Sequence, residues 1–275
     1  AMIILNAVTI LVELVAGIMT KSLSLQSDAF HMLTDEFSLI IGLVANNLSI
    51  KPPGDTMTFG WTRMEPFGGL CNAAFLLAVC ISIFCSAMQR FIHVPEIDKP
   101  LLFIIVGSVG FVINLSGIFI FHDHHHSDNL KGVFLHILGD FFGSVGVMIS
   151  ACVINFTNWK YKYYVDPVIS LMIVAILSAG AIPLLKRTGK IVLEKVPENV
   201  SLPQIRRDLS TIPQVIAFHD LHVWELSKKL NYGSVHIVVN GNTAHNHSII
   251  KLVNEIMRKN KVKLTTIQVE YADNF

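Results

Sequence analysis

The chain has 275 residues, of which 52% are hydrophobic and only 15% are charged, and its formal net charge is +1. Its mean hydropathy is +0.55, whereas a typical soluble domain has about 25% charged residues and is less apolar. The near-neutral charge and the lack of a basic run exclude the electrostatic footprint of a nucleic-acid-binding protein. This composition predicts an integral membrane protein.

Apolar runs of about 20 residues, the length that a helix needs to cross a bilayer, recur along the first two thirds of the chain. The six runs cover approximately residues 2–19, 29–48, 67–91, 101–121, 133–156 and 165–185. We therefore predict a six-helix transmembrane domain over residues 1–187, with a polar, histidine-containing loop at residues 121–131.

The last ninety or so residues, 188–275, contain no such run and indicate a separate soluble domain. Apolar spacing predicts helices near residues 201–212 and 249–256, and β-forming residues predict strands at 215–226, 232–239 and 263–271. The resulting order is α-β-β-α-β. Such an order is compatible with a small sheet covered on one side by two helices, which leaves sheet area free to pair with a second copy.

A histidine and an aspartate four residues apart occur twice, as His31 with Asp35 and as His136 with Asp140, and each pair lies within an apolar run. On a helix, residues four apart share one face, so two such helices facing each other supply four metal ligands. An ionisable group inside hydrocarbon costs at least about 2.5 kcal/mol, which favours a functional role. An interhelical hydrogen bond is the alternative for one pair, but it does not explain two pairs at equal spacing.

Two imidazole nitrogens and two carboxylate oxygens suit the tetrahedral coordination of Zn²⁺, whereas Ca²⁺ and Mg²⁺ prefer six or more oxygens. The two carboxylates also balance the charge of a divalent ion. These ligands bind metal only when they are deprotonated, so protonation from an acidic side expels zinc and zinc binding releases protons. The ligand set therefore predicts exchange of Zn²⁺ for protons, with zinc as the transported substrate.

Two further patterns lie in the predicted connections between spans. The loop carries four histidines that predict a low-affinity zinc collector, with a solvated linker as the alternative: His122, His124, His125 and His126. Asn155 and Thr157 form an N-glycosylation pattern, which is usable only if this connection faces away from the cytosol.

The order and spacing of several motifs resemble the cation diffusion facilitator family of zinc transporters over nearly the whole chain. The motifs are the two His/Asp pairs, the stretch from Phe59 to Glu65 (FGWTRME), the histidine run, and the stretch from His219 to Leu226 (HDLHVWEL). Within the family they resemble most the branch of zinc transporter one, a plasma-membrane zinc exporter.

The resemblance implies a homodimer with a six-helix membrane domain in each subunit and a ferredoxin-like cytosolic domain at the C-terminus. It also implies a transporter, not an enzyme, that exchanges cytosolic zinc for protons by alternating access. Both termini are then cytosolic and the plasma membrane is the expected location, with an intracellular vesicle membrane as the alternative.

Relatives in this family bind zinc in the cytosolic domain at places that correspond to His219, His236, Gln268 and Glu270. The resemblance therefore implies a regulatory zinc site, although glutamine is a poor zinc ligand and ordinary surface histidines are the alternative.

A second function from another class is a non-transporting zinc-sensing receptor or partner subunit. The complete set of four predicted membrane ligands favours transport, because a subunit that does not transport zinc has no need of these four residues. An intramembrane metalloenzyme is disfavoured: Glu36, next to Asp35, points about 100° away on a helix and is a poor general base.

Overall fold

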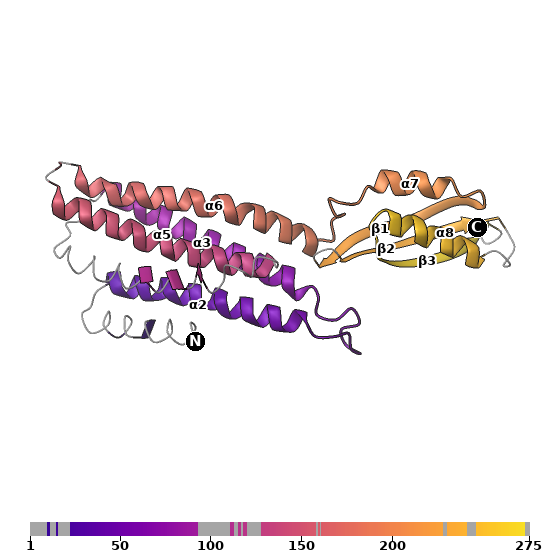
Figure 1. Cartoon of the computed structure of the whole chain (residues 1–275), viewed down its shortest axis with the longest axis horizontal. Helices are drawn as coiled ribbons and strands as arrows, with labels where there is room; N and C mark the ends of the chain where they lie inside the picture. Colours follow the sequence, from indigo (N-terminus) through magenta and orange to yellow (C-terminus); the bar gives the residue numbers. More distant parts are fainter. Residues whose placement is uncertain are drawn as a thin grey trace. The chain divides into compact units, whose positions relative to one another are not determined.

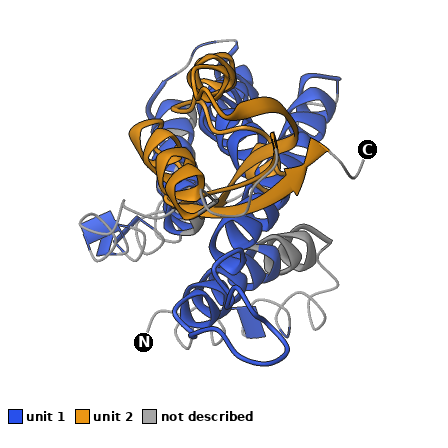
Figure 2. Cartoon of the chain, turned by 90° about the vertical axis from the view of Figure 1, so that its right-hand side faces the viewer, with its two compact units in different colours: residues 1–188 blue, residues 189–275 orange. Residues whose placement is uncertain are grey.

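The computed structural model describes residues 10–11, 15, 23–92, 111–112, 115–116, 118–119, 128–157, 159, 161–227, 230–240 and 246–272 (Figure 1). The chain divides into two compact units, residues 1–188 and residues 189–275 (Figure 2). Each unit has its own packed interior and is described separately.

The first unit is built from long helices. They are α2 (Leu23–Ser49), α3 (Met64–Ile92), α5 (Asp128–Phe156), the short 3-10 helix η2 (Lys162–Tyr164) and α6 (Val165–Val192), the last of which runs to just beyond the division between the units. At about 1.5 Å per residue, a helix of 27 to 29 residues exceeds the roughly 30 Å hydrocarbon core of a bilayer.

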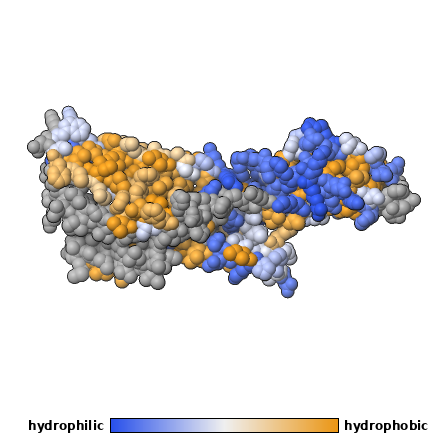
Figure 3. Space-filling model, in the orientation of Figure 1, coloured by the Kyte–Doolittle hydropathy of each residue, from blue (hydrophilic) through white to orange (hydrophobic). Residues whose placement is uncertain are grey.

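Among the described residues, three helical segments are long and apolar enough to cross a membrane: Met64–Ile92, Leu130–Ser150 and Lys162–Val192. They coincide with three of the six predicted spans. Helix α2 covers a fourth predicted span, 29–48, while the predicted spans 2–19 and 101–121 fall largely outside the described residues. Large apolar side chains cover the helix surfaces visible in Figure 3, as lipid contact requires, and Ile81 and Met172 are 65% and 60% exposed.

Helices α2, α3 and α5 contact one another pairwise. Helix α6 packs on α3 through a small apolar cluster: Leu76, Cys80, Leu177 and Ala181. Glycines on α5 and α6 allow close approach, because a Cβ at Gly180 would lie 2.9 Å from Leu135 Cδ2 and one at Gly146 would lie 2.7 Å from Ile169 Cγ2. The direct contact between α2 and α5 places the two predicted His/Asp helices side by side.

The second unit has the element order that the sequence predicted. It runs α7 (Leu202–Ser210), β1 (Val215–Ser227), β2 (Leu230–Val239), α8 (Asn246–Lys259) and β3 (Leu264–Tyr271). The sheet order is β1-β2-β3; β1 pairs antiparallel with β2, and β2 pairs parallel with β3 because α8 returns the chain to the same end.

The core of this unit lies between the two helices and one face of the sheet. Alternate residues of β2, namely Val235, Ile237 and Val239, are buried against apolar residues of both helices, which include Leu209 and Met257. The intervening residues of the strands therefore lie on the opposite face, where the histidines predicted as ligands are found.

Candidate metal centres

The membrane pairs lie on two neighbouring helices. His31 and Asp35 belong to α2, although their side chains fall outside the described residues, and His136 and Asp140 belong to α5. Because α2 and α5 are in direct contact, the four residues lie on helices that can supply one common site.

His136 is buried in the first unit, with only 3% of its surface exposed. Its Nε2 atom lies 3.3 Å from the main-chain carbonyl oxygen of Asn72 on α3. Asp140, one turn further along α5, is half-buried, and its main-chain carbonyl accepts a hydrogen bond of 2.9 Å from the Ser144 hydroxyl. A third helix thus contacts the predicted transport histidine.

The other predicted sites of the membrane unit are only partly described. His122, His124, His125 and His126 lie outside the described residues. Asn155 belongs to the last turn of α5, with its side chain outside the description, and the Thr157 hydroxyl donates a 2.5 Å hydrogen bond to the Val153 carbonyl.

The strand registers of the second unit bring the predicted cytosolic residues to one face of the sheet. His219 on β1 is opposite His236 on β2, and His236 is opposite Gln268 on β3, with Glu270 two residues further on. The imidazole rings of His219 and His236 are 5.0 Å apart between centroids.

The Glu270 carboxylate lies between the two histidines. Its Oε2 atom is 3.0 Å from His219 Nε2 in a hydrogen bond. Its Oε1 atom lies 2.9 Å from His236 Nδ1 as an ion pair, although this buried Nδ1 atom makes no hydrogen bond within the described part of the chain. The Gln268 amide nitrogen donates a 3.0 Å hydrogen bond to the same Oε1 atom, so Gln268 orients Glu270.

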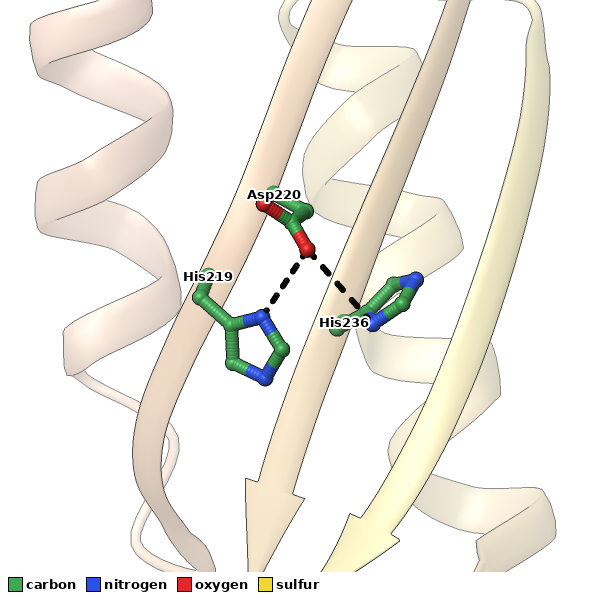
Figure 4. A group of neighbouring side chains, drawn as sticks. All are labelled: His219, Asp220 and His236. Atoms are coloured by element: carbon green, nitrogen blue, oxygen red, sulfur yellow. Dashed lines mark hydrogen bonds and ion pairs between the residues drawn. The ribbon is translucent and has the colours of Figure 1, made fainter.

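Asp220 is a site residue that the sequence reasoning missed (Figure 4). Its carboxylate Oδ2 lies 3.2 Å from His219 Nδ1 and 4.0 Å from His236 Nδ1. Consecutive residues of a regular strand point to opposite faces, so alternation assigns Asp220 to the face opposite His219. The β-bulge between His219 and His222, with Asp220 at a φ of +49°, turns the carboxylate back onto the histidine face.

Potential ligand atoms of His219, Asp220 and His236 all lie within 4.8 Å of one another. Imidazole nitrogens and a carboxylate oxygen are the donors that zinc prefers, so this donor set fits a zinc ion. The hydrogen bond that the His219 imidazole donates to the Glu270 carboxylate, and after it the one donated to Asp220, raise the pKa of His219. Protons and a metal ion therefore compete for the His219 nitrogen atoms at this place.

The chain has apolar, membrane-length helices that carry histidine and aspartate residues, which are potential metal ligands, and a small α/β unit follows them. This is the organisation of a metal-ion transporter. Residues 1–193 match the sequence model of the cation efflux transmembrane domain, and residues 197–272 match that of the cation efflux protein cytoplasmic domain. The chain belongs to the cation efflux family, which confirms the resemblance to the cation diffusion facilitators. The second match is to a domain named for dimerisation and points to a dimer.

Curated relatives are similar over nearly the whole chain. The metal cation efflux system protein CzcD of Cupriavidus metallidurans is 35% identical over 98% of this chain and 84% of its own length. The vacuolar zinc transporter ZRC1 of Saccharomyces cerevisiae is 30% identical over 98% of this chain and 81% of its own length. A cadmium, cobalt and zinc/H(+)-K(+) antiporter of Bacillus subtilis is 29% identical over 94% of this chain and 84% of its own length. The family and these relatives are transporters, not enzymes.

Proposed function

We propose that this chain carries Zn²⁺ out of the cytosol in exchange for protons, with zinc held by His31, Asp35, His136 and Asp140. The observation that carries the proposal is the recurrence of the same His/Asp pair, four residues apart, on two helices that contact each other. The burial of His136 supports it, because an ionisable side chain inside an apolar helix bundle is costly and indicates a functional role.

The chemistry of the four ligands accounts for coupling. Two carboxylates and two neutral imidazoles cancel the charge of Zn²⁺, so the loaded site is electrically neutral in a region of low dielectric constant. When the site opens to a more acidic side, protons compete for the same lone pairs and zinc leaves. The name of the Bacillus subtilis relative, which joins zinc to protons and potassium in an antiporter, supports the proton coupling.

The proposed architecture is a homodimer of six-span subunits that work by alternating access, each with a ferredoxin-like cytosolic domain over residues 188–275. The family matches and the α-β-β-α-β order support this architecture. Residues 1–187 form the transport domain of each subunit. The histidines of the loop at residues 121–131 are proposed to collect zinc near the entrance.

The test is zinc flux into liposomes under an imposed pH gradient, with the full chain reconstituted. We expect flux that follows the gradient in the native chain and falls to background in Asp140→Asn and in His136→Ala, because each change removes a ligand. Asp55→Asn is the matched control, since Asp55 is an exposed carboxylate in the loop after α2 and its loss leaves flux intact.

Two results would change the assignment. Full flux in Asp140→Asn would contradict the proposed ligand set. Tight zinc binding without flux, in a folded and oriented preparation, would support the alternative of a zinc-sensing receptor or partner subunit.

The cytosolic cluster is proposed as a regulatory zinc site formed by His219, Asp220, His236 and Glu270, with Gln268 orienting Glu270. Zinc titration of the full chain lacking the membrane ligands isolates this site. We expect Asp220→Asn and His236→Ala to weaken the remaining zinc binding. His222→Ala is the control, because His222 is an exposed histidine on the same strand, and equal loss there would contradict the assignment.

The membrane in which the protein resides is a separate proposal. The sequence motifs predict the plasma membrane, whereas the yeast relatives are named as vacuolar transporters, which supports the alternative of an intracellular membrane. Imaging of the tagged full chain together with plasma-membrane and vacuolar markers distinguishes the two. A glycan on Asn155, detected by enzymatic deglycosylation, would assign the end of α5 to the non-cytosolic side.

A further inference from the structure

The predicted transport histidine contacts the main chain of a helix that supplies no predicted zinc ligand. His136 Nε2 lies 3.3 Å from the carbonyl oxygen of Asn72 on α3, with hydrogen-bond geometry. A carbonyl oxygen only accepts hydrogen bonds, so Nε2 must carry the proton that it donates. A neutral imidazole has a single ring proton, and Nδ1 therefore keeps its lone pair.

The packing of α3 and α5 holds this contact in place. Asn72 is fully buried and His136 is 3% exposed. One turn before His136, a Cβ on Gly132 would lie 2.7 Å from the Cβ of Asn72, a separation that side-chain carbons essentially never adopt. Only glycine at this position lets α5 approach α3 closely enough for the imidazole to reach the carbonyl.

We propose that the Asn72 carbonyl is a positioning group for the transport site: it holds His136 as the Nε2–H tautomer and presents Nδ1 as the zinc-binding atom. The inference rests on the proposed function, in which His136 is a ligand. Metal-binding histidines commonly donate their second ring N–H to a carbonyl or carboxylate, which fixes the ring and its tautomer. Helix α3 thus takes part in zinc binding without contributing a ligand, and Gly132 sets the distance.

The first experiment reads the tautomer and the ligating atom directly. Two-bond ¹H–¹⁵N spectra are recorded on the full chain, labelled with ¹⁵N-histidine in lipid nanodiscs, above the pH at which imidazoles titrate. The signals of His136 are identified by their absence in His136→Ala. We expect the metal-free protein to show a protonated Nε2, and addition of ¹¹³Cd²⁺ to produce a cadmium coupling to Nδ1.

The outcomes separate this inference from the proposed function. A protonated Nδ1 in the metal-free protein, or cadmium coupling to Nε2, would overturn the positioning role while leaving His136 as a ligand. Absence of any cadmium effect on the His136 ring, with cadmium bound elsewhere, would overturn the ligand assignment itself and this inference with it.

The second experiment tests the role of the α3–α5 distance with three glycine variants on α5. Gly132→Ala creates the overlap with Asn72. Gly146→Ala creates a comparable overlap with Ile169 Cγ2 at 2.7 Å, ten residues beyond His136, and an added Cβ at Gly143 meets nothing within 4 Å. We expect only Gly132→Ala to mix the tautomers and to weaken ¹¹³Cd²⁺ binding, by about 10- to 100-fold.

Equal effects in Gly132→Ala and Gly146→Ala would mean that general packing is responsible and would overturn the proposal. If Gly132→Ala does not fold, the spectra of the native chain still test the proposed tautomer and zinc-binding atom, because those spectra need no glycine variant.

Discussion

His219 Nε2 lies 3.0 Å from Glu270 Oε2, a hydrogen bond that joins strands β1 and β3 across β2. This bond is the main cause of the raised pKa of His219, and Asp220 adds to it. Glu270→Gln is therefore expected to lower the pKa of His219 toward the ordinary value of about 6.5. Histidine ring signals followed by NMR in the metal-free full chain measure the change.

The same bond predicts how stability depends on pH. Because the folded-state pKa is raised, the stabilisation is fully present below the ordinary pKa and is lost as the pH rises through the folded-state pKa. Glu255→Gln, which changes an exposed carboxylate on α8, is the control and should leave His219 unaffected. A pKa of His219 that is the same in Glu270→Gln as in the native chain would contradict the assignment.

Asp208 on α7 connects this helix to Asn260, the residue that directly follows α8. Its carboxylate accepts hydrogen bonds from Asn260 Nδ2 at 3.2 Å and from Gln204 Nε2 at 2.6 Å, and these bonds lower the pKa of Asp208. A lowered pKa stabilises the fold above the ordinary pKa, and this contribution is lost as the pH falls through the folded-state pKa. The protection factors of the α7 and α8 amides, which relate the observed exchange rate to the intrinsic rate at each pH, should therefore fall in acid, and less so in Asp208→Asn. The control, Asp55→Asn, should retain the full acid response.

Asn231 holds the start of β2 to the turn before β3. It is 1% exposed, and its Nδ2 atom donates to the Lys261 carbonyl at 3.0 Å and to Asn199 Oδ1 at 3.4 Å. Asn231→Ala leaves the Lys261 carbonyl without this donor, and we expect a loss of about 1–3 kcal/mol in the unfolding free energy of this unit. Asn199→Ala removes only the longer contact and should cost less. Hydrogen exchange of β2 and β3 in the full chain measures both, and a larger loss in Asn199→Ala would refute the ranking.

Arg90 and Asp166 form an ion pair between the last turn of α3 and the first turn of α6. The two side chains are 49% and 19% exposed, so the pair should contribute less than about 1 kcal/mol. Arg90→Gln is expected to lower the thermal stability of the purified protein slightly, and added salt should reduce the difference.

The charge-reversed double variant, Arg90→Asp with Asp166→Arg, provides the check on this pair. It should recover only part of the loss, because a negative charge at the end of α3 and a positive charge at the start of α6 both oppose the helix dipoles. Complete recovery would show that the dipoles contribute nothing here.

Local patterns in the sequence were sufficient for the secondary structure of the second unit. The predicted strand at 215–226 is β1 (Val215–Ser227), and the predicted helix at 201–212 contains α7 (Leu202–Ser210). Hydrophobic periodicity reports which face of an element is buried, and this is a property of neighbouring residues. For the same reason the i, i+4 spacing assigned His136 and Asp140 to one helix. The grouping of His219, His236 and Glu270 came instead from the family resemblance, and the strand registers place them on one face of the sheet.

Tertiary structure alone decided three features of the candidate sites. A β-bulge, in which Asp220 itself has a positive φ, places the Asp220 carboxylate on the same face as His219. Regular strand alternation would place it on the opposite face. The close approach of α5 to α3 at Gly132 made the Asn72 carbonyl the partner of His136, and the return of the chain through α8 brought Glu270 between two histidines. The residue types alone determined which groups can ligate a metal. Neither a β-bulge nor a main-chain acceptor can be recognised from residue types, because every residue has a carbonyl. Only packing between distant segments selects the carbonyl that accepts the hydrogen bond.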